Sequence, residues 1–334
     1  MSLLRRLLLR ALSTAALTVA AVCASGAVAA LGGVFSRRLD ILTHLAPIWL
    51  AGAFAAAVLG LAAPAGAARR ATFALALAGL LASGLLMAPE YLRPDPPAAP
   101  ADAPRQIRLV QFNAWGGRNA DVDGALAWLL KTHPDVIVME EPSRALVAAL
   151  RNAGGYHASC YTAHDRFCGS VVLSRAKPLS RGFEEAAGRR GRIPAARAVL
   201  PAPGGGTFTV MAAHLLWPTS ARGQAWQRRR IGELLDPPGR RDRLILAGDF
   251  NSTPWSFARR ADDRAWGLRR RTRALFSWPT PFAQLRGLGA PFPLLPIDHV
   301  YAGSAWRTVK VERGPAIGSD HYPVLVVLAL APQA

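Results

Sequence analysis

The sequence predicts an α/β domain built on mixed sheets, preceded by a unit of three transmembrane helices. Three uncharged apolar runs occupy the first 88 residues, and a proline-rich stretch follows them. From residue 105 onward, short apolar runs alternate with amphipathic helical patterns or with turns that contain glycine and proline. Because helices join some strands and hairpins join others, we expect a mixed-sheet α/β sandwich rather than an all-parallel doubly wound sheet.

Residues 1–88 are predicted to form a membrane anchor. No Asp, Glu, Lys or Arg occurs in residues 11–35, 41–68 or 71–88, which predicts spans at about 11–35, 41–63 and 71–88. A hydrocarbon core of about 30 Å requires roughly 20 apolar residues. A signal peptide is the alternative for the first run, but its apolar centre is only about 7–15 residues long. Two further apolar runs follow, so we expect three spans, a linker at 89–104 and a catalytic domain at 105–332.

The basic residues of the anchor predict its orientation. The short loops of membrane proteins carry more Lys and Arg on the cytoplasmic side. With the N-terminus in the cytoplasm, five arginines lie on that side and two lie outside; these are Arg5, Arg6, Arg10, Arg69 and Arg70, against Arg37 and Arg38 with Asp40. Three spans then leave the remaining chain outside the cytoplasm, as part of a multi-pass protein of the cell (inner) membrane.

The composition excludes several classes of protein. A hydrophobic content of 51% excludes a mainly disordered chain. The three cysteines are too few for a disulfide-dense scaffold, and no two have the spacing of a zinc knuckle. Cys160 and Cys168 either close a loop as a disulfide or remain two small unpaired hydrophobic residues, and Cys23 lies inside the first span. The formal charge of +19 comes almost entirely from arginine, so it is weak evidence for a polyanionic partner.

The elements of the α/β domain follow one another from residue 107 to residue 330. We expect strands at 107–112, 136–139, 170–173, 208–212, 244–247, 299–301 and 324–330. A helix is expected at 122–131, where Leu126, Leu129 and Leu130 share one face. The three glycines at 204–206 are a turn and not a phosphate-binding loop, because no helix with Lys followed by Ser or Thr comes after them.

Polar residues stand directly at the ends of these strands, where a strand holds a side chain rigidly. They are Asn113, Glu140, Glu141, His214, Asp249, Asn251, Asp298, Asp320 and His321. Their carboxylate and amide oxygens suit Mg²⁺ or Mn²⁺, which needs only one or two protein carboxylates. The two histidines are suited to proton transfer near neutral pH. Together these groups fit hydrolysis of a phosphate ester.

Taken singly, several of these residues have ordinary structural explanations. Asn113 is also a common turn residue, and Glu140 or Glu141 before Pro142 could be a first-turn acid of a helix. His214 could be a partly buried histidine with its hydrogen bonds satisfied. The Gly-Asp-Phe-Asn and Ser-Asp-His-Tyr-Pro motifs are more specific, because each places several short polar groups beside a buried strand.

The ordered set of motifs resembles the endonuclease/exonuclease/phosphatase superfamily, in its membrane-anchored bacterial branch. The matching pieces lie in the family's order across about residues 105–330: Val-Gln-Phe-Asn113, Pro-Asp-Val-Ile-Val-Met-Glu-Glu141, Gly169-Ser-Val-Val-Leu-Ser-Arg175, Ala-Ala-His214-Leu, Gly-Asp249-Phe-Asn251, Ile-Asp298-His-Val and Gly-Ser-Asp320-His321-Tyr-Pro. The resemblance implies a four-layer α/β sandwich, in which two mixed sheets pack face to face with helices outside.

The resemblance also implies a role for each residue. Glu141 corresponds to the metal-ligand glutamate, with Asn113 and Asp320 beside the metal. The family usually has Gln-Glu at this point, and here Glu140 replaces the glutamine. The metal implied is Mg²⁺ or Mn²⁺.

The remaining residues are assigned by the resemblance to the phosphate and to proton transfer. Asp249 and Asn251 would orient the attacking water and the scissile phosphate. His321 would contact the phosphate or act as general base, with Asp298 fixing its tautomer. His214 corresponds to the histidine that protonates the leaving group.

The substrate is predicted only by class. An extracytoplasmic, membrane-anchored hydrolase favours a lipid phosphate or lipid diester as substrate. The alternatives are a nuclease acting on DNA and a catalytically silent binding protein. A nuclease could use an arginine- and tryptophan-rich set, which comprises Arg228, Arg229, Arg230, Arg259, Arg260, Arg264, Arg269, Arg270 and Arg271 with Trp226, Trp255 and Trp266. The same arginines could instead be solvated helix faces or contacts to anionic lipid.

Overall fold

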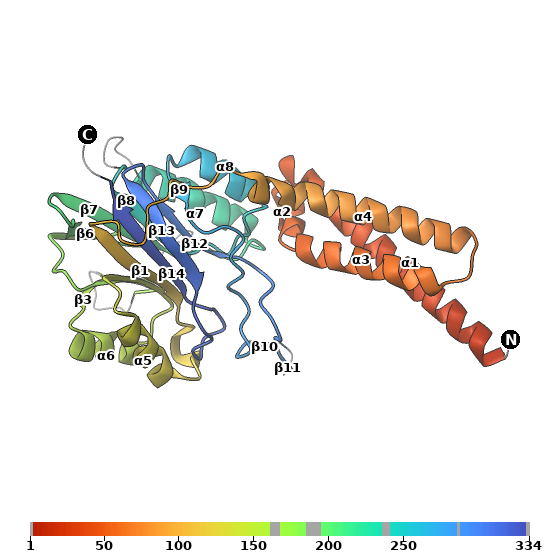
Figure 1. The fold of residues 1–334 in the computed structure, drawn as a ribbon, viewed down its shortest axis with the longest axis horizontal. Helices are drawn as coiled ribbons and strands as arrows, with labels where there is room; N and C mark the ends of the chain where they lie inside the picture. The colour runs from red at the N-terminus through yellow and green to blue at the C-terminus, as the bar shows by residue number, and fades with distance from the viewer. Residues whose placement is uncertain (1–2, 161–167, 185–194, 236–240, 286–287, 332–334) are drawn as a thin grey trace. The chain divides into compact units, whose positions relative to one another are not determined.

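The chain forms two compact units, which are drawn in Figure 1. This computed structural model describes residues 3–160, 168–184, 195–235, 241–285 and 288–331. The helical unit comprises Met1–Arg93 and Thr253–Ala261. The sandwich unit comprises Pro94–Ser252 and Asp262–Ala334.

The helical unit packs small residues inside and exposes large apolar ones. Its helices are α1 (Leu3–Leu31), the short 3-10 helix η1 (Gly32–Val34), α2 (Arg37–Thr43), α3 (Ala46–Ala62) and α4 (Ala67–Leu92). Ala20, Ala56 and Ala76 are buried where α1, α3 and α4 meet. On α4, Leu81 and Leu85 are 59% and 65% exposed. Burial of alanine with exposure of leucine is the arrangement of helices that face lipid.

Two helices are long and apolar enough to cross a membrane, Leu3–Val34 and Ala67–Leu92. A third span is reached only if α2 and α3, which are bent by 56° to one another, are counted together. Pro47 lies in the first turn of α3 and has no N–H to donate, and its ring would clash with a helical carbonyl one turn earlier. The expected continuous helix at 41–63 is therefore broken near His44. The outer helices are also longer than expected, because α1 begins at Leu3 and α4 continues through Pro89 to Leu92.

Within the helical unit, Asp40 caps the helix α8 (Phe257–Ala265). Its Oδ1 accepts a hydrogen bond from the backbone N–H of Phe257 at 2.8 Å, and its Oδ2 accepts from Ala258 N–H at 3.0 Å and from Ser256 Oγ at 3.1 Å. Asp40 is 6% exposed. The first amide groups of a helix have no partner inside the helix, so a buried carboxylate at this point satisfies them.

Replacing Asp40 with alanine should loosen the start of α8. The change removes the acceptor of three donors, and an unsatisfied buried donor typically costs about 1–3 kcal/mol. We expect faster amide hydrogen exchange in peptides that cover Phe257 and Ala258, measured by mass spectrometry on the full chain in nanodiscs. Asp102→Ala, at an exposed aspartate, provides the control. Equal amide hydrogen exchange in the Asp40→Ala and Asp102→Ala variants would show that Asp40 does not cap α8.

The sandwich unit contains two six-stranded mixed sheets. The first runs β13 (Trp306–Arg313), β14 (Val324–Leu330), β1 (Gln106–Asn113), β2 (Val136–Glu140), β4 (Ser170–Ser174) and β3 (His157–Ser159). The second runs β5 (Ser180–Glu184), β6 (Ala195–Pro201), β7 (Thr207–Ala213), β8 (Leu244–Asp249), β12 (Asp298–Ala302) and β9 (Arg269–Arg270). In each sheet one central pair is parallel, β1 with β2 and β7 with β8, and the other pairs are antiparallel. A short separate hairpin pairs β10 (Gln284–Leu285) with β11 (Leu288–Gly289).

The two sheets pack face to face around one core and carry helices outside. Leu109 and Val138 of the first sheet pack with Val210 and Ile245 of the second. Helices α5 (Val122–Thr132) and α6 (Arg144–Gly154) cover the outer face of the first sheet, and α7 (Ala221–Leu234) covers the outer face of the second. The prediction of two mixed sheets flanked by helices is confirmed, and each of the seven runs expected to be strands is one.

The proline-rich segment is attached to the sandwich unit and is not a freely solvated linker throughout. Thr308 N–H on β13 donates to Pro97 O at 2.7 Å, and Ala99 N–H donates to Thr308 O at 2.9 Å. This short parallel bridge covers part of the edge strand β13. Cys160 and Cys168 form a disulfide with a Cα–Cα distance of 6.0 Å, which resolves the two alternatives left open for this pair.

Candidate active site

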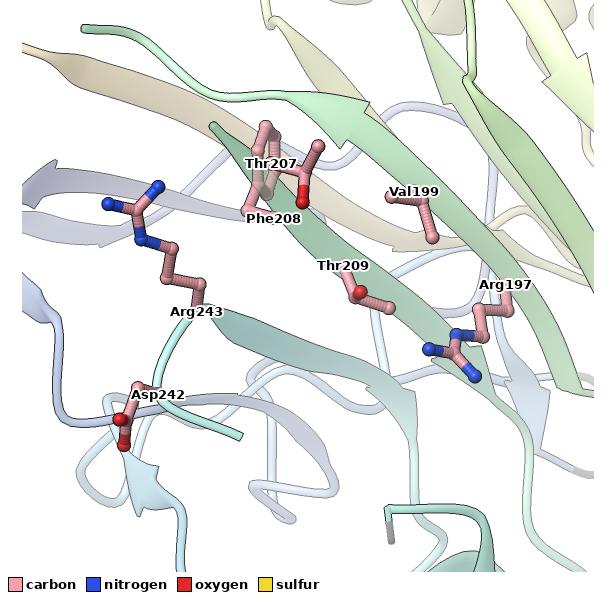
Figure 2. Close-up of a pocket in the computed structure, with 7 residues that line it drawn as sticks. All are labelled: Arg197, Val199, Thr207, Phe208, Thr209, Asp242 and Arg243. Atoms are coloured by element: carbon pink, nitrogen blue, oxygen red, sulfur yellow. The ribbon is translucent and has the colours of Figure 1, made fainter. Parts of the chain in front are cut away.

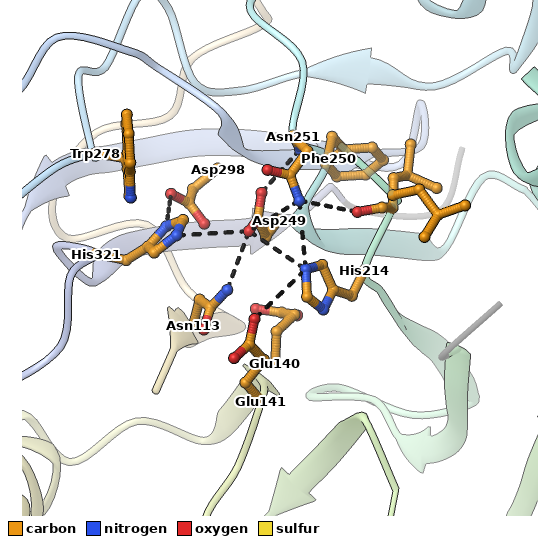
Figure 3. Close-up of polar contacts among 12 residues, drawn as sticks. Asn113, Glu140, Glu141, His214, Asp249, Phe250, Asn251, Trp278, Asp298 and His321 are labelled. Atoms are coloured by element: carbon orange, nitrogen blue, oxygen red, sulfur yellow. Dashed lines mark hydrogen bonds and ion pairs between the residues drawn. The ribbon is translucent and has the colours of Figure 1, made fainter. Parts of the chain in front are cut away.

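The polar strand ends of the two sheets meet in one buried cluster, shown in Figure 3. The pairing of the strands places the residues of this cluster beside one another. The parallel register of β1 and β2 places Asn113 beside Glu140, and the antiparallel register of β8 and β12 places Asp249 beside Asp298. Because one pair comes from each sheet, the sandwich brings four polar side chains to the same end of its core.

Asp249 is the centre of the cluster. Its Oδ2 accepts a hydrogen bond from Asn113 Nδ2 at 3.0 Å and lies 3.6 Å from Nε2 of both His214 and His321. Its Oδ1 accepts the backbone N–H of Asn251 at 2.8 Å. Burial raises the pKa of Asp249, while the charge of His321 opposes this rise. The carboxylate therefore lies between two imidazoles and is a stronger base than a solvated aspartate.

His321 is held by Asp298. The Nδ1 of His321 lies 2.8 Å from Asp298 Oδ2, and both side chains are buried. The backbone is fixed as well, because Ser319 Oγ donates to Asn113 O at 2.6 Å and accepts the N–H of His321 at 3.1 Å. A carboxylate on Nδ1 sets which face of the imidazole is presented, so Nε2 is the atom directed toward Asp249.

The electrostatics of the pair favour a charged imidazole. Burial alone would lower the pKa of His321, but the carboxylates of Asp298 and Asp249 outweigh it and raise the value to about 10. Burial would raise the pKa of Asp298, but the charge and hydrogen bond of His321 outweigh it and lower the value. In the metal-free protein, His321 is therefore an imidazolium at neutral pH and loses its proton only as the pH rises toward 10.

This assignment predicts the titration of His321. Since its pKa is raised, the ring should remain protonated at pH 8, where an ordinary histidine with a pKa near 6.5 is neutral. Asp298→Asn removes the largest contribution that raises the pKa, so the midpoint should fall by at least one pH unit. NMR of ¹³C-labelled histidine in the metal-free full chain measures both values. A wild-type midpoint near 6.5 would contradict the assignment.

His214, Asn251 and Glu141 form the more open side of the cluster. Asn251 Nδ2 donates to Leu215 O at 2.9 Å and lies 3.4 Å from His214 Nε2. Glu141 Oε1 lies 3.9 Å from the same nitrogen, and its side chain is 44% exposed. Glu141 and Asn251 both have positive φ, 43° and 46°, which few non-glycine residues adopt. Such backbone conformations are common at functional sites, where the surrounding structure holds them.

The residues present fit a divalent cation. Asp320 Oδ2 accepts a hydrogen bond from Trp278 Nε1 at 3.1 Å, whereas its Oδ1 is buried without a hydrogen-bond partner among the described residues. Glu141 is close enough to raise the pKa of Asp320, after the larger effect of burial. Two neighbouring carboxylates, one with an unsatisfied buried oxygen, are the donor set that Mg²⁺ or Mn²⁺ takes.

A second possible ligand group is Asp249, Asp298 and His321, whose ligand atoms lie within 4.8 Å of one another. These atoms already satisfy one another, because Asp298 accepts from His321 and Asp249 accepts from Asn113. A cation there would have to displace the proton that His321 holds. Glu141 and Asp320 are less engaged than these groups, whereas the Asn113 amide donates to Asp249 and accepts the N–H of Trp115.

The structure brings every residue singled out in the sequence into this cluster or its immediate surroundings. Sequence reasoning missed Gln111 and Trp278, and it placed Ser319 in a motif without assigning it a role. Gln111 could have been noticed, because it shares the inward-facing parity of Ile107 and Leu109 on β1 and so places an amide in an apolar position. No local pattern marks Trp278, because its contact with Asp320 depends on the fold.

Five members of the arginine- and tryptophan-rich set are buried, while Arg229, Arg264 and Arg269 are exposed. Arg259, Arg270 and Arg271 are at most 4% exposed, and Trp255 and Trp266 are at most 3% exposed. Arg228 forms an ion pair with Asp262, and Arg270 forms one with Asp263. The sequence suggested a nucleic-acid surface here, and this is wrong for the five buried members because they are packed inside the protein.

A pocket elsewhere on the sandwich unit contains none of the cluster residues (Figure 2). It is lined by Arg197, Val199, Thr207, Phe208, Thr209, Asp242 and Arg243. These residues lie on β6, around the start of β7 and just before β8, whereas His214 follows the other end of β7. The pocket is therefore separate from the candidate active site.

Comparisons with known proteins agree with this fold. The endonuclease/exonuclease/phosphatase from Beutenbergia cavernae matches with a TM-score of 0.52 and 21% identity, over 68% of this chain and 72% of its own. The catalytic domain of human Nocturnin matches with a TM-score of 0.53 and 16% identity, over 73% and 99%. D. rerio TDP2 complexed with a single-strand DNA product matches with a TM-score of 0.52 and 16% identity, over 67% and 98%. No curated protein matches the sequence.

The sequence itself matches the model of one protein family. The matched segment, residues 110–321, is the greater part of the chain and begins in β1 and ends at His321. It contains Asn113, Asp249 and Asp298 together with all the other residues of the cluster. This chain therefore belongs to the endonuclease/exonuclease/phosphatase family.

Proposed function

We propose that this protein is a membrane-anchored, divalent-metal-dependent phosphoesterase whose catalytic domain lies outside the cytoplasm. Members of its family are hydrolases that act on phosphate esters. The observation that supports the proposal best is Asp249, a buried carboxylate 3.6 Å from each of two histidines. One buried base flanked by two imidazoles can activate water on one side of a phosphate and protonate a leaving group on the other.

Asp249, His321 and Asp298 each have a separate role in the proposed reaction. Asp249 orients the attacking water and takes its proton, helped by its raised pKa. His321 is charged at neutral pH, which favours contact with the phosphate oxygens over the alternative role of general base. Asp298 keeps that imidazolium in place.

His214 and Asn251 serve the leaving group and the phosphate. The His214 side chain is 18% exposed, more than that of His321, so it can meet a leaving group that enters from solvent. Asn251 Nδ2 lies within 3.4 Å of His214 and can orient the phosphate beside it. We assign His214 as the acid that protonates the departing oxygen.

Glu141 and Asp320 would hold the cation, with Asn113 beside it. Bound Mg²⁺ or Mn²⁺ supplies Lewis-acid stabilisation of the charge that develops on the phosphate. The unsatisfied Oδ1 of Asp320 supports this assignment, because a buried carboxylate oxygen is rarely left without a partner.

Three observations support a membrane location with an extracytoplasmic catalytic domain. Among the described residues two helices are apolar and long enough to cross a membrane, and the bent α2–α3 pair would be a third span if it is counted as one. The arginine distribution favours an N-terminus in the cytoplasm. The disulfide between Cys160 and Cys168 suits an oxidising compartment.

A lipid phosphate is the substrate class that this location favours. Hydrolysis of DNA is the second candidate, because the matched TDP2 structure holds a single-strand DNA product. The burial of Arg259, Arg270 and Arg271 weighs against DNA. A binding protein without turnover is the third candidate. The cluster weighs against it, because it contains every residue to which the proposed reaction assigns a role.

The experiment that tests the proposal compares substrates on the full chain in nanodiscs. Release of phosphate or phosphorylated headgroup from vesicles that contain phosphatidic acid or sphingomyelin is measured beside cleavage of single-stranded DNA, with Mg²⁺, Mn²⁺ or EDTA. We expect metal-dependent turnover of a lipid and little cleavage of DNA. Cleavage of DNA alone would make the protein a nuclease, and no turnover of any phosphate ester would favour the binding protein.

A further inference from the structure

Gln111 and Glu140 form a buried polar layer directly behind the Asp298–His321 pair. Both side chains are fully buried. Gln111 Nε2 donates one hydrogen bond to Asp298 Oδ1 and one to Glu140 Oε2, and both distances are 2.8 Å. The layer thus joins β1, β2 and β12, which belong to both sheets.

These contacts fix the orientation of the Gln111 amide. Both hydrogens of Nε2 are directed at carboxylate oxygens. An amide rotated by 180° would place its own oxygen against the same two carboxylates, which is unfavourable. The side-chain nitrogen therefore faces Asp298, and Glu140 keeps it there.

Asp298 in turn has both of its carboxylate oxygens occupied. Its Oδ1 accepts from Gln111, and its Oδ2 lies on Nδ1 of His321. Without Gln111, the carboxylate would keep only Ser277 and His321 among these hydrogen-bond partners, and the imidazole that it holds would be less firmly directed toward Asp249. Groups that orient a catalytic histidine in this way typically affect activity by about 10–100-fold.

We infer that Gln111 is a positioning residue of this active site and that Glu140 holds its amide in place. This inference rests on the proposed function. Glu140 belongs to the buried cluster, but neither it nor Gln111 is assigned a contact with substrate or metal, and each acts through Asp298. The hydrogen bond that Glu140 accepts is its contribution, so glutamine at position 140 can replace it, whereas leucine cannot.

The same layer contributes little to stability. Glu140 Oε1 and Gln111 Oε1 are buried and have no hydrogen-bond partner among the described residues. Buried polar pairs with unsatisfied atoms can be replaced by apolar residues of similar volume with little loss of stability, or even a gain. The double variant Gln111→Leu/Glu140→Leu removes both partners and should therefore fold, which allows the effect of the layer on the reaction to be measured separately. Gln111→Leu alone leaves buried oxygens of Glu140 and Asp298 without this donor and should be less stable.

The test uses steady-state kinetics of the full chain in nanodiscs with bis(p-nitrophenyl) phosphate and Mg²⁺. We expect Gln111→Leu and Glu140→Leu each to lower kcat by about 10–100-fold with KM changed less than about threefold. Glu140→Gln should stay within about threefold of wild type. The double variant should be no worse than Gln111→Leu, because the two residues act in one chain. Gln106→Leu is the matched control, since Gln106 lies on the same strand and its side-chain amide donates, among the described residues, to Ala101 O and Ala103 O.

The following results would overturn the inference or a part of it. Wild-type kcat in Gln111→Leu overturns it. A Glu140→Gln variant as slow as Glu140→Leu overturns the role of the accepted hydrogen bond. An inactive wild-type chain overturns the proposed function and this inference with it, and is distinguished by the absence of turnover in the Gln106→Leu control as well.

Discussion

Replacing Asp249 with asparagine should lower kcat for phosphate-ester hydrolysis by roughly 10³-fold, within the range of general acid–base catalysis. The carboxylate lies 3.6 Å from Nε2 of both His214 and His321. Asparagine has nearly the same shape and keeps an oxygen for the backbone N–H of Asn251, so the loop should retain its conformation. The substitution therefore removes the base and keeps the loop contact, but it also puts a donor where Asn113 Nδ2 had an acceptor, so stability is measured beside activity.

Kinetics with bis(p-nitrophenyl) phosphate and a thermal transition on the same preparation check this result. Asp242→Asn is the matched control, because Asp242 accepts from Ser304 Oγ and lies just before β8, whereas Asp249 is at the other end of that strand. An Asp249→Asn variant with more than about a tenth of wild-type kcat would show that Asp249 is not the base.

Glu141→Gln should weaken metal binding and lower turnover at limiting Mg²⁺ by roughly 10²-fold. The Glu141 side chain is 44% exposed, so it can change without leaving a buried charge unpaired. The loss should be smaller at high Mg²⁺, because mass action compensates for a weaker site. Asp320 and Asn113 remain in place in this variant.

Two measurements separate a metal ligand from other roles of Glu141. The Mg²⁺ concentration for half-maximal turnover should rise at least tenfold, and binding of Mn²⁺ measured by electron paramagnetic resonance should weaken in parallel without any substrate present. Glu233→Gln, in an exposed ion pair with Arg230, serves as the control. Unchanged Mn²⁺ affinity in Glu141→Gln would exclude Glu141 as a ligand.

The central strands of the sandwich could be predicted from the sequence because their signal is local. The strands β2, β4 and β14 are buried at every position, and such strands appear as continuous apolar runs. The edge strand β13 escaped prediction, since it carries Thr308, Lys310 and Glu312 and is mostly partly exposed. The strand β6 escaped because four of its seven residues are Ala or Pro, which are poor indicators of a strand.

The helical unit shows where local patterns fail. The arginines at positions 5, 6 and 10 interrupted the apolar run but do not interrupt α1, because Arg is a good helix former. The uncharged run 41–63 contained no signal for the bend except Pro47. Asp40 was expected only as a loop charge, and its role as the cap of α8 depends on a contact more than 200 positions away in the sequence.

The candidate site was predictable in its members but not in its connections. Asn113, Asp249 and Asp298 stand at strand ends that the sequence already indicates, and the family motifs assign their order. The central position of Asp249 follows from the packing of two sheets, which no spacing along the chain encodes. The roles of Gln111 and Glu140 could not be predicted from the sequence for the same reason, because each residue acts through a partner on another strand.

The most direct test of the proposed phosphoesterase function compares the hydrolysis of bis(p-nitrophenyl) phosphate by wild type and by His321→Ala. Both proteins are assayed as full chains in nanodiscs with Mg²⁺ and with EDTA. The account predicts Mg²⁺-dependent release of p-nitrophenol by wild type, abolished by EDTA, and a loss of at least roughly 10²-fold in His321→Ala because the charge next to the phosphate is gone. Equal turnover by the two proteins would contradict it, since the reaction would then occur without the cluster around Asp249.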